Sequence, residues 1–353
     1  MDQPITIKDI ARICGCGVST VSRALNNHPD INEATRNKIL SVVKEYNFVP
    51  NNSARNLKIA DSKTIAVLIK GIANPFFMKM MKVIEYEIQK QKYSLIIHHV
   101  EHHQDEVDVA IELEKEKRLK GIIFLGGYFN HTKEKLDSIN VPFVISTVNM
   151  TEEYRGYYSS VAVDDVKESY KIVDYLCKLG HKKILLVSAD PTDESIGKLR
   201  KEGYELALND NNITVDDSLI FPMAFDEDAY SMAAGYKAMN EAINKKVDFT
   251  AVFAISDAMA IGACRALVDA GKKIPDDVSV VGFDGIDNAS YYNPRITTIR
   301  QPFEDMAKAS INLLFNYIDG PKDATETQQR IFEAELMIGE STASIKQNKT
   351  SGF

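Results

Sequence analysis

Two hydrophobic patterns divide the chain at about residue 64. Before that point, apolar residues recur every three or four positions, which is the spacing of short amphipathic helices. After it, apolar runs of strand length alternate with amphipathic stretches of helical length. The first pattern predicts a small all-α unit. The second predicts an α/β fold, with parallel sheets covered by helices on both faces.

The stretch from 6 to 26 predicts two short helices joined by a tight turn. Thr6 and Asp9 have the spacing of a capping box, which starts a helix. Apolar positions 7, 10, 11 and 14 share one face before Gly15 and Gly17 interrupt the pattern. A third helix is expected after Asn32, a favourable N-cap, with positions 39, 42, 43 and 46 on its apolar face.

The second helix carries candidate chemistry on its outer face, because Val18, Val21 and Leu25 are expected to face inward. The side chains left outside are short and polar with one guanidinium: Ser19, Thr20, Ser22, Arg23 and Asn26. Such groups can meet base edges and phosphates in the DNA major groove. On the residues alone, a DNA-reading helix and a solvated helical hairpin fit equally well.

A resemblance decides between these two interpretations. The strings TIKDIAR, VSTVSRALN, NEATRNKIL and FVPN resemble the head of the lactose/galactose repressor family of bacterial transcription regulators. The resemblance extends to about residue 342 and implies a helix-turn-helix head over 1–50 that binds operator DNA, with Thr6 and Val18 among the contacting residues. Gly17 stands where the family usually has a capping serine, but glycine can also cap a helix.

The segment 51–63 links this head to the rest of the chain. A helix from about 52 to 58 would be too short to be stable alone, so a flexible linker is one interpretation. The resemblance implies a hinge helix that orders on operator DNA. In that case Leu57 enters the minor groove, Ala54 allows two hinge helices to approach closely, and Asn51 stands at the helix start.

The remaining chain predicts two doubly wound lobes in series. Strands are expected at 64–71, 94–100, 121–127 and 142–148, then at 183–189, 219–225, 250–256 and 278–285. Helices are expected near 76–91, 104–118, 130–138, 165–179, 194–210, 228–244 and 257–270. In such sheets ligands bind outside the carboxyl ends of the strands, so two facing lobes predict a cleft between those ends.

The resemblance adds boundaries to this body. It implies a periplasmic-binding-protein-like body over 64–342, with lobe 1 at about 64–163 and 301–325 and lobe 2 at about 164–300 and 326–342. The tail at 343–353 is polar and lacks leucine heptads. A homodimer is therefore expected rather than the tetramer of one family branch.

Candidate ligand-binding residues follow the predicted strands. They are Asn74, Phe76, Phe77, Arg200, Ser256 and Asp284. The segment ITTIRQPFEDMAKASINLLFNYIDG resembles the family's crossing strand and return helix, and this resemblance adds Gln301 at the cleft border. Guanidinium, carboxylate, hydroxyl and aromatic groups together suit a polyhydroxylated ring. Plainer roles are open too: the two phenylalanines as core, Arg200 as a surface charge, and Asp257 as a helix cap. The resemblance places the family's inducer-contact motifs R-x-x-G-[YF] and VGFD on Arg200 and Asp284.

Charge and composition narrow the function classes. Residues 1–60 hold eight Lys/Arg against five Asp/Glu, a net +3, so the rest of the chain, with net charge −8 overall, carries −11. A basic end suits a polyanion. The four cysteines lack disulfide or zinc spacing, and the histidines between 98 and 103 cannot converge on one point, so no metal or cofactor is expected. No signal peptide or membrane span is evident, and a cytoplasmic protein is expected.

The sequence therefore predicts a homodimeric, sequence-specific DNA-binding regulator whose cleft binds a small ligand, most plausibly a sugar or sugar derivative. One alternative is control by a phosphorylated carrier protein, as in the catabolite branch of the family. A solute-binding protein would share the body but need an export signal and no head. An enzyme is not expected, because the chain has no P-loop, G-x-S-x-G or H-E-x-x-H motif.

Overall fold

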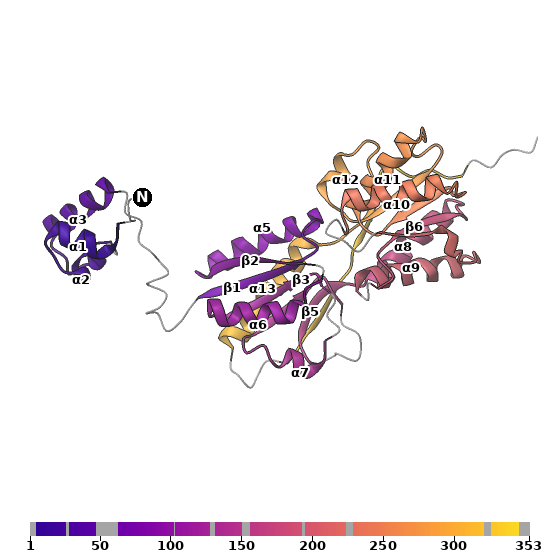
Figure 1. The fold of residues 1–353 in the computed structure, drawn as a ribbon. Helices are drawn as coiled ribbons and strands as arrows, with labels where there is room; N and C mark the ends of the chain where they lie inside the picture. Colours follow the sequence, from indigo (N-terminus) through magenta and orange to yellow (C-terminus); the bar gives the residue numbers. More distant parts are fainter. Residues whose placement is uncertain are drawn as a thin grey trace, which may run out of the picture. The chain divides into compact units, whose positions relative to one another are not determined.

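A computed structural model of the chain describes residues 5–25, 28–46, 63–101, 103–127, 131–149, 156–192, 195–223, 229–320 and 326–345. The chain divides into two compact units, a head up to Ser62 and a body from Lys63 onward (Figure 1). The candidates Asn26, Asn51, Ala54 and Leu57 lie outside the described residues, as does the expected hinge helix.

Three short helices form the head: α1 (Ile7–Cys14), α2 (Val18–Leu25) and α3 (Glu33–Glu45). Thr6 and Asp9 make the expected capping box, and Asn32 caps α3 through a hydrogen bond from the Ala34 amide. Gly15 has φ 65°, a conformation that favours glycine, and ends α1. The Gly17 carbonyl accepts the amides of Thr20 and Val21, so the turn forms without a capping side chain.

The head has its own small core. Its buried side chains are Ile10, Ala11, Cys14, Val21, Ala24 and Ile39. Two expectations about inward-facing residues are wrong. Val18 is 41% exposed because it begins α2 before the first buried turn, and Tyr46 is 46% exposed because it lies just past the end of α3.

Lobe 1 of the body is built on a six-stranded, wholly parallel sheet in the order β11-β5-β4-β3-β1-β2. Its strands are β1 (Thr64–Lys70), β2 (Ser94–Val100), β3 (Gly121–Leu125), β4 (Phe143–Ser146), β5 (Ser159–Val163) and β11 (Gln329–Phe332). Its helices are α5 (Pro75–Lys90), α6 (Glu106–Lys117), α7 (Lys133–Leu136) and α13 (Phe303–Asp319).

Alternation along β1 explains the three layers of lobe 1. Ile65, Val67 and Ile69 pack into a cluster with buried residues of α5 and α13. Ala66 and Leu68 point to the other face and pack with residues of α6 and α7. A strand that is buried on both faces must be apolar throughout, which is why TIAVLIK reads as a continuous hydrophobic run.

Lobe 2 repeats this plan with a sheet in the order β12-β10-β9-β8-β6-β7, in which only the β10–β12 pair is antiparallel. Its strands are β6 (Ile184–Ser188), β7 (Ile220–Pro222), β8 (Ala251–Ala254), β9 (Ser279–Asp284), β10 (Thr297–Arg300) and β12 (Glu335–Met337). Its helices are α8 (Asp165–Lys178), α9 (Ile196–Asp210), a 3-10 turn (Asp217–Leu219), α10 (Met232–Asn244), α11 (Asp257–Asp269) and α12 (Asp287–Tyr291). The pairs α8/α9 and α10/α11 cover opposite faces (Figure 1).

The chain passes between the lobes three times, after β5, after β10 and after β11. The third passage was expected at 325/326 but lies at 333–334, because β11 pairs with β5 of lobe 1. Strands β5, β11 and β12 were not among the predicted strands, whereas β10 (Thr297–Arg300) matches the crossing strand that the resemblance implies. In the described part of the chain, no helix is long and apolar enough to cross a membrane.

Candidate functional site

In the head, the candidate surface is the outer face of α2. Ser19 and Arg23 are exposed, and Thr20 and Ser22 are half-buried. Thr6 stands at the start of α1, where its amide donates to Asp9 Oδ2 at 3.0 Å and its Oγ1 accepts from the Asp9 amide at 3.4 Å. α2 therefore presents hydroxyls and one guanidinium on the side opposite Val21 and its buried neighbours, as the sequence predicts.

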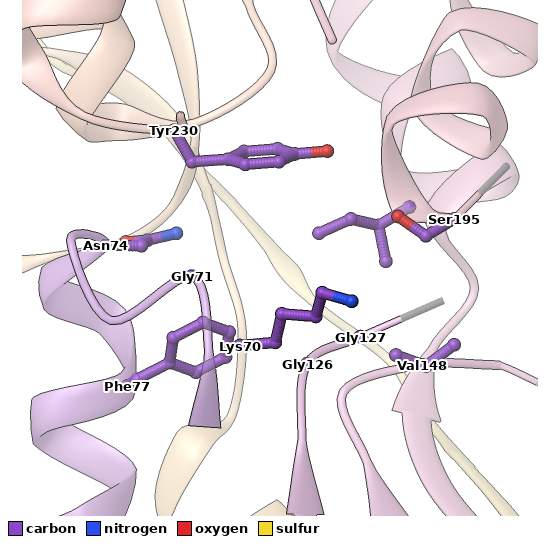
Figure 2. A pocket seen from close by; sticks show the side chains of 10 residues that line it. Lys70, Gly71, Asn74, Phe77, Gly126, Gly127, Val148, Ser195 and Tyr230 are labelled. Atoms are coloured by element: carbon purple, nitrogen blue, oxygen red, sulfur yellow. The ribbon is translucent and has the colours of Figure 1, made fainter. Parts of the chain in front are cut away.

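In the body, a pocket lies between the lobes at the carboxyl ends of the strands (Figure 2). Its space is about 450 Å³ when the solvent at its open mouth is included. Its lining residues are Lys70, Gly71, Asn74, Phe77, Gly126, Gly127, Val148, Ser195, Ile196 and Tyr230. Lys70 ends β1, the next six follow strands β1, β3 and β4 of lobe 1, and the last three belong to lobe 2.

Two aromatic rings and several polar groups face this pocket. Figure 2 shows the ring of Tyr230 above the space and the ring of Phe77 below it, with the Ser195 hydroxyl and the Lys70 ammonium end on the side away from Asn74. Asn74 and Phe77 are the sequence candidates that line the pocket. An aromatic ring supplies a platform for the C–H face of a sugar or for a planar base, and the polar groups supply directed hydrogen bonds.

Asn74 joins the two lobes directly. Its Oδ1 accepts the Phe76 amide at 3.0 Å and caps α5, while its Nδ2 donates to Asp284 Oδ2 of lobe 2 at 2.8 Å. The Gln301 side chain, at the second interlobe passage, donates to the other Asp284 oxygen at 2.8 Å. Asp284 is thus held from lobe 1, from lobe 2 and from the connection between them.

Arg200 is buried behind this group rather than on the pocket lining. It is 2% exposed and donates through Nε to Asp165 Oδ1 at 2.8 Å and through a terminal nitrogen to the Ile255 carbonyl. A longer contact of 3.5 Å reaches Asp284 Oδ1, and the guanidinium stacks 3.7 Å from the Phe283 ring centre. We call Arg200, Asp165, Asp284, Asn74 and Gln301 the buried polar network.

Burial controls the ionisation of the carboxyl groups here. Desolvation raises the pKa of Asp165 to about 6, and the Arg200 charge opposes that rise. The pKa of Asp284 is also raised by burial, against the lowering effects of Arg200, Asn74 and Gln301. Arg200 therefore favours the charged form of both carboxyl groups against the effect of burial.

The remaining candidates have structural partners. Phe76 is 2% exposed and belongs to the lobe core, with its ring centre 5.9 Å from that of Phe77. Ser256, rather than Asp257, caps α11, since its Oγ accepts the Met259 amide at 3.2 Å. Asp257 instead accepts the Ile286 amide at 2.8 Å, and burial together with the Asp284 charge raises its pKa to about 8.

Some backbone strain lies at or beside the pocket. Tyr230 lines the pocket and has φ 58°, while Thr147, next to the lining residue Val148, and Asp284 of the buried polar network have φ 73° and 113°. Non-glycine residues rarely occupy this region, although the chain also has such residues away from the pocket. Gly126 (φ 75°) lines the pocket where an added Cβ would lie 2.5 Å from the Lys70 carbonyl, so only glycine fits. Such strain persists where the surrounding structure holds it and is typical of functional sites.

Sequence reasoning missed Lys70, Val148, Ser195, Ile196 and Tyr230. The sequence does carry a signal for Lys70, because a lysine closes an otherwise apolar strand. For the others, local sequence gave no comparable signal. Among the described residues, no group of three or more His, Cys, Asp or Glu could hold a metal ion.

Two family models match the chain. Residues 6–51 match the bacterial regulatory proteins, lacI family, and residues 173–342 match a periplasmic binding protein-like domain. A similar protein along the whole length is the HTH-type transcriptional regulator MalR of Clostridium butyricum. The two are 42% identical over 346 residues, which are 97% of this chain and 100% of that protein.

Solved structures of similar fold include two with bound sugars. One is a transcriptional regulator CelR–cellobiose complex, with a TM-score of 0.68 and 26% identity, covering 96% of this chain and 99% of that chain. Another is a LacI family transcriptional regulator from Enterococcus faecium with bound ribose. Its TM-score is 0.69 at 30% identity, and the match covers 80% of this chain and 100% of that chain.

Proposed function

The chain belongs to the lacI family of bacterial regulatory proteins, and we propose that it is a cytoplasmic repressor controlled by a sugar or sugar derivative. Members of this family are transcription regulators and not enzymes. The observation that carries the ligand proposal is the pocket between the lobes, in which Phe77 and Tyr230 flank directed polar groups. The bound cellobiose and ribose in two structures of similar fold support the same ligand class.

The DNA side of the proposal rests on α2. Arg23 is exposed on the last turn of a helix whose other face is buried, so its five N–H donors are available to guanine or phosphate. Ser19, Thr20 and Ser22 supply shorter contacts on the same helix. Leu57, at the position that the family uses to open the minor groove, would couple the body to the DNA.

The coupling proposal rests on contacts that join the lobes. The hydrogen bond from Asn74 to Asp284 spans the pocket edge, and Lys79 of α5 pairs with Asp287 of lobe 2 at 2.6 Å. A ligand that engages both lobes would change their relative rotation and so favour one of two arrangements. The hinges at 51–63 would transmit that rotation to the paired heads.

We also propose a homodimer, because large apolar side chains are exposed on adjoining elements of lobe 1. Met78 and Tyr86 of α5 are 62% and 66% exposed, and Ile97 of the edge strand β2 is 54% exposed. Covering them with a second copy would remove this apolar surface from water. Sedimentation equilibrium tests this, and a Tyr86→Glu variant should weaken the dimer. An unchanged association constant would place the interface elsewhere.

The test of the ligand proposal starts from operator DNA selected from a random duplex library with the full-length protein. DNA affinity is then measured by fluorescence anisotropy with neutral sugars, sugar phosphates and nucleobases in turn. A ligand at 100 times its Kd should also stabilise the body by about 2.7 kcal/mol, which thermal unfolding detects. A sugar that changes both DNA affinity and stability is the expected result.

Two tyrosines give a matched control for this test. Tyr230→Ala should abolish the ligand response and leave DNA affinity without ligand unchanged, because its ring faces the pocket. Tyr291→Ala removes a ring that is 89% exposed on α12, outside the pocket lining, and should respond like the parent. Equal ligand responses in both variants would move the site away from this pocket.

A further inference from the structure

Lys70 is the one lysine among the residues that line the pocket. It is the last residue of β1, where the preceding strand residues are apolar. Although it is charged, it is only 8% exposed. Figure 2 shows its side chain extending past Phe77 so that the ammonium end reaches the space enclosed by the lining residues. An ammonium in this position would ordinarily favour a phosphate or carboxylate on the ligand.

Glu106 cancels that charge. Lys70 Nζ donates to Glu106 Oε2 at 3.1 Å and to the Gln104 carbonyl at 2.8 Å. Both side chains are buried, at 6% and 4% exposure, so solvent screens their attraction very little. Behind them, His131 lies 3.5 Å from the other Glu106 oxygen and 3.6 Å from Asp105, which pairs with Lys135 at 2.6 Å. The Lys70–Glu106 pair is thus followed by a second ion pair, Asp105 with Lys135, and the His131 ring lies within reach of both acidic side chains.

Arg200, the other cation near the pocket, is neutralised in the same way. Its guanidinium faces Asp165 at 2.8 Å and Asp284 at 3.5 Å, so two carboxylates surround one positive charge. With Glu106, three buried acidic side chains therefore face the two buried cations Lys70 and Arg200. In sequence, the lining residues Ser195 and Tyr230 also follow the all-acidic stretches 193–194 and 226–228.

This balance has an energetic consequence for the ligand. A phosphate entering the pocket would give up its hydration without meeting an uncompensated cation, and charge burial without a partner is costly. Hydroxyl groups carry no net charge and can both donate to the carboxylates and accept from the ammonium. An ion pair at the pocket wall is thus a good partner for a polyol and a poor one for an anion.

We propose that Lys70 contacts the ligand and that Glu106 neutralises it, so that the pocket selects an uncharged polyhydroxylated ligand over the phosphorylated form of the same sugar. Lys70 and Glu106 then determine specificity within the ligand class given above. The inference rests on the proposed sugar-controlled function. It adds that the pocket rejects phosphorylated sugars.

Titration calorimetry on the full-length protein tests this with matched pairs: ribose with ribose 5-phosphate, glucose with glucose 6-phosphate, and cellobiose with its 6-phosphate. The parent should bind the neutral member of a pair at least about tenfold more tightly, a difference of about 1.4 kcal/mol. Glu106→Gln leaves the Lys70 charge without its carboxylate. Its preference should shift toward the phosphorylated member by about tenfold or more, because the buried ammonium then has no carboxylate partner.

Two further variants separate charge from folding. Glu112→Gln removes an exposed carboxylate from the same helix α6 and should leave the preference unchanged. If Glu106→Gln does not fold, as circular dichroism would show, the double variant Lys70→Met with Glu106→Gln removes both charges together. It should fold, bind the neutral sugar more weakly because the ammonium donor is lost, and still reject the phosphate.

The outcomes separate this inference from the proposed function. Equal or tighter binding of a sugar phosphate by the parent overturns the inference while leaving a sugar-controlled regulator in place. An unchanged preference in the folded Glu106→Gln protein, or undiminished sugar affinity in the double variant, also overturns it. If no sugar or sugar phosphate binds at all, the proposed function fails and this inference fails with it.

Discussion

Removing Arg200 should destabilise the body before it affects any ligand. The substitution Arg200→Met keeps most of the aliphatic stem but leaves Asp165 and Asp284, both 1% exposed, without their guanidinium. Removing one partner of a buried ion pair typically costs about 3 to 5 kcal/mol, because the remaining charge stays desolvated. That is comparable to the entire stability of many domains, so a ligand-response experiment on this variant alone would be uninterpretable.

The pH dependence of this loss identifies its cause. The pKa of Asp165 is raised to about 6 in the folded protein, above its ordinary value, so its contribution to stability is complete at low pH and is lost as pH rises through 6. Removing Arg200 removes a charge that lowers this pKa and so raises it further. The difference between Arg200→Met and the parent should therefore be smallest near about pH 5 and largest near about pH 8.

The assay is urea unfolding followed by circular dichroism at these two pH values, since the chain has no tryptophan. Lys201→Met on the same helix removes only an exposed pair with Glu205 and should cost about 0.5 kcal/mol or less. Adding Asp165→Asn to Arg200→Met should recover part of the loss, because it removes one buried charge. A cost below about 1 kcal/mol, or an equal cost at both pH values, would refute this account of the network.

Three other changes test separate parts of the molecule. Arg23→Ala should lose specific DNA binding with an unchanged melting temperature, since the side chain is exposed; normal retention of operator DNA would mean that α2 is not the reader. Leu57→Ala should weaken operator binding about tenfold or more and reduce the ligand's effect on it, while leaving ligand affinity unchanged. If parent and variant have equal operator affinity and equal ligand response, the segment 51–63 is only a tether. Asp257→Asn should flatten the fall in stability between about pH 5 and pH 8, because burial raises the Asp257 pKa to about 8 and the folded state prefers the neutral acid. A parallel pH profile in parent and variant would contradict this.

The regular parts of the fold could be predicted from local sequence because local chemistry decides them. The run TIAVLIK is apolar throughout since both faces of β1 are covered, and caps such as Thr6 and Asn32 satisfy amides within three residues. Strand β5 was not predicted because it begins with two polar residues, Ser159 and Ser160. Ser159 is buried only because Tyr317 and the Gln328 amide, more than 150 residues away, satisfy its hydroxyl. No local pattern reports such a partner.

The location of the candidate site could be predicted from the sequence, but the pairing of its charged side chains could not. Strand ends pointed to the correct edge of each sheet, and Asn74 and Phe77 do line the pocket. The sequence could not show that Arg200 meets Asp165, 35 residues earlier, or that Lys70 meets Glu106, 36 residues later. Those pairings depend on the three-dimensional path of the chain. These pairings determine whether Arg200 and Lys70 are available to a ligand or are neutralised by a carboxylate.

The short strands β11 and β12 set the order of events during synthesis. Both sheets receive their last strand from the single stretch 329–337, after more than nine-tenths of the chain has left the ribosome. At about 5 to 20 residues per second, the edge strand β5 of lobe 1 waits about 8 to 33 seconds for β11, and the edge strand β10 of lobe 2 waits about 2 to 7 seconds for β12. Exposed edges of this kind invite pairing with other chains. A chain that terminates before residue 329 would leave both lobes in that state permanently, and chaperones and proteases rather than ligand would then decide its fate.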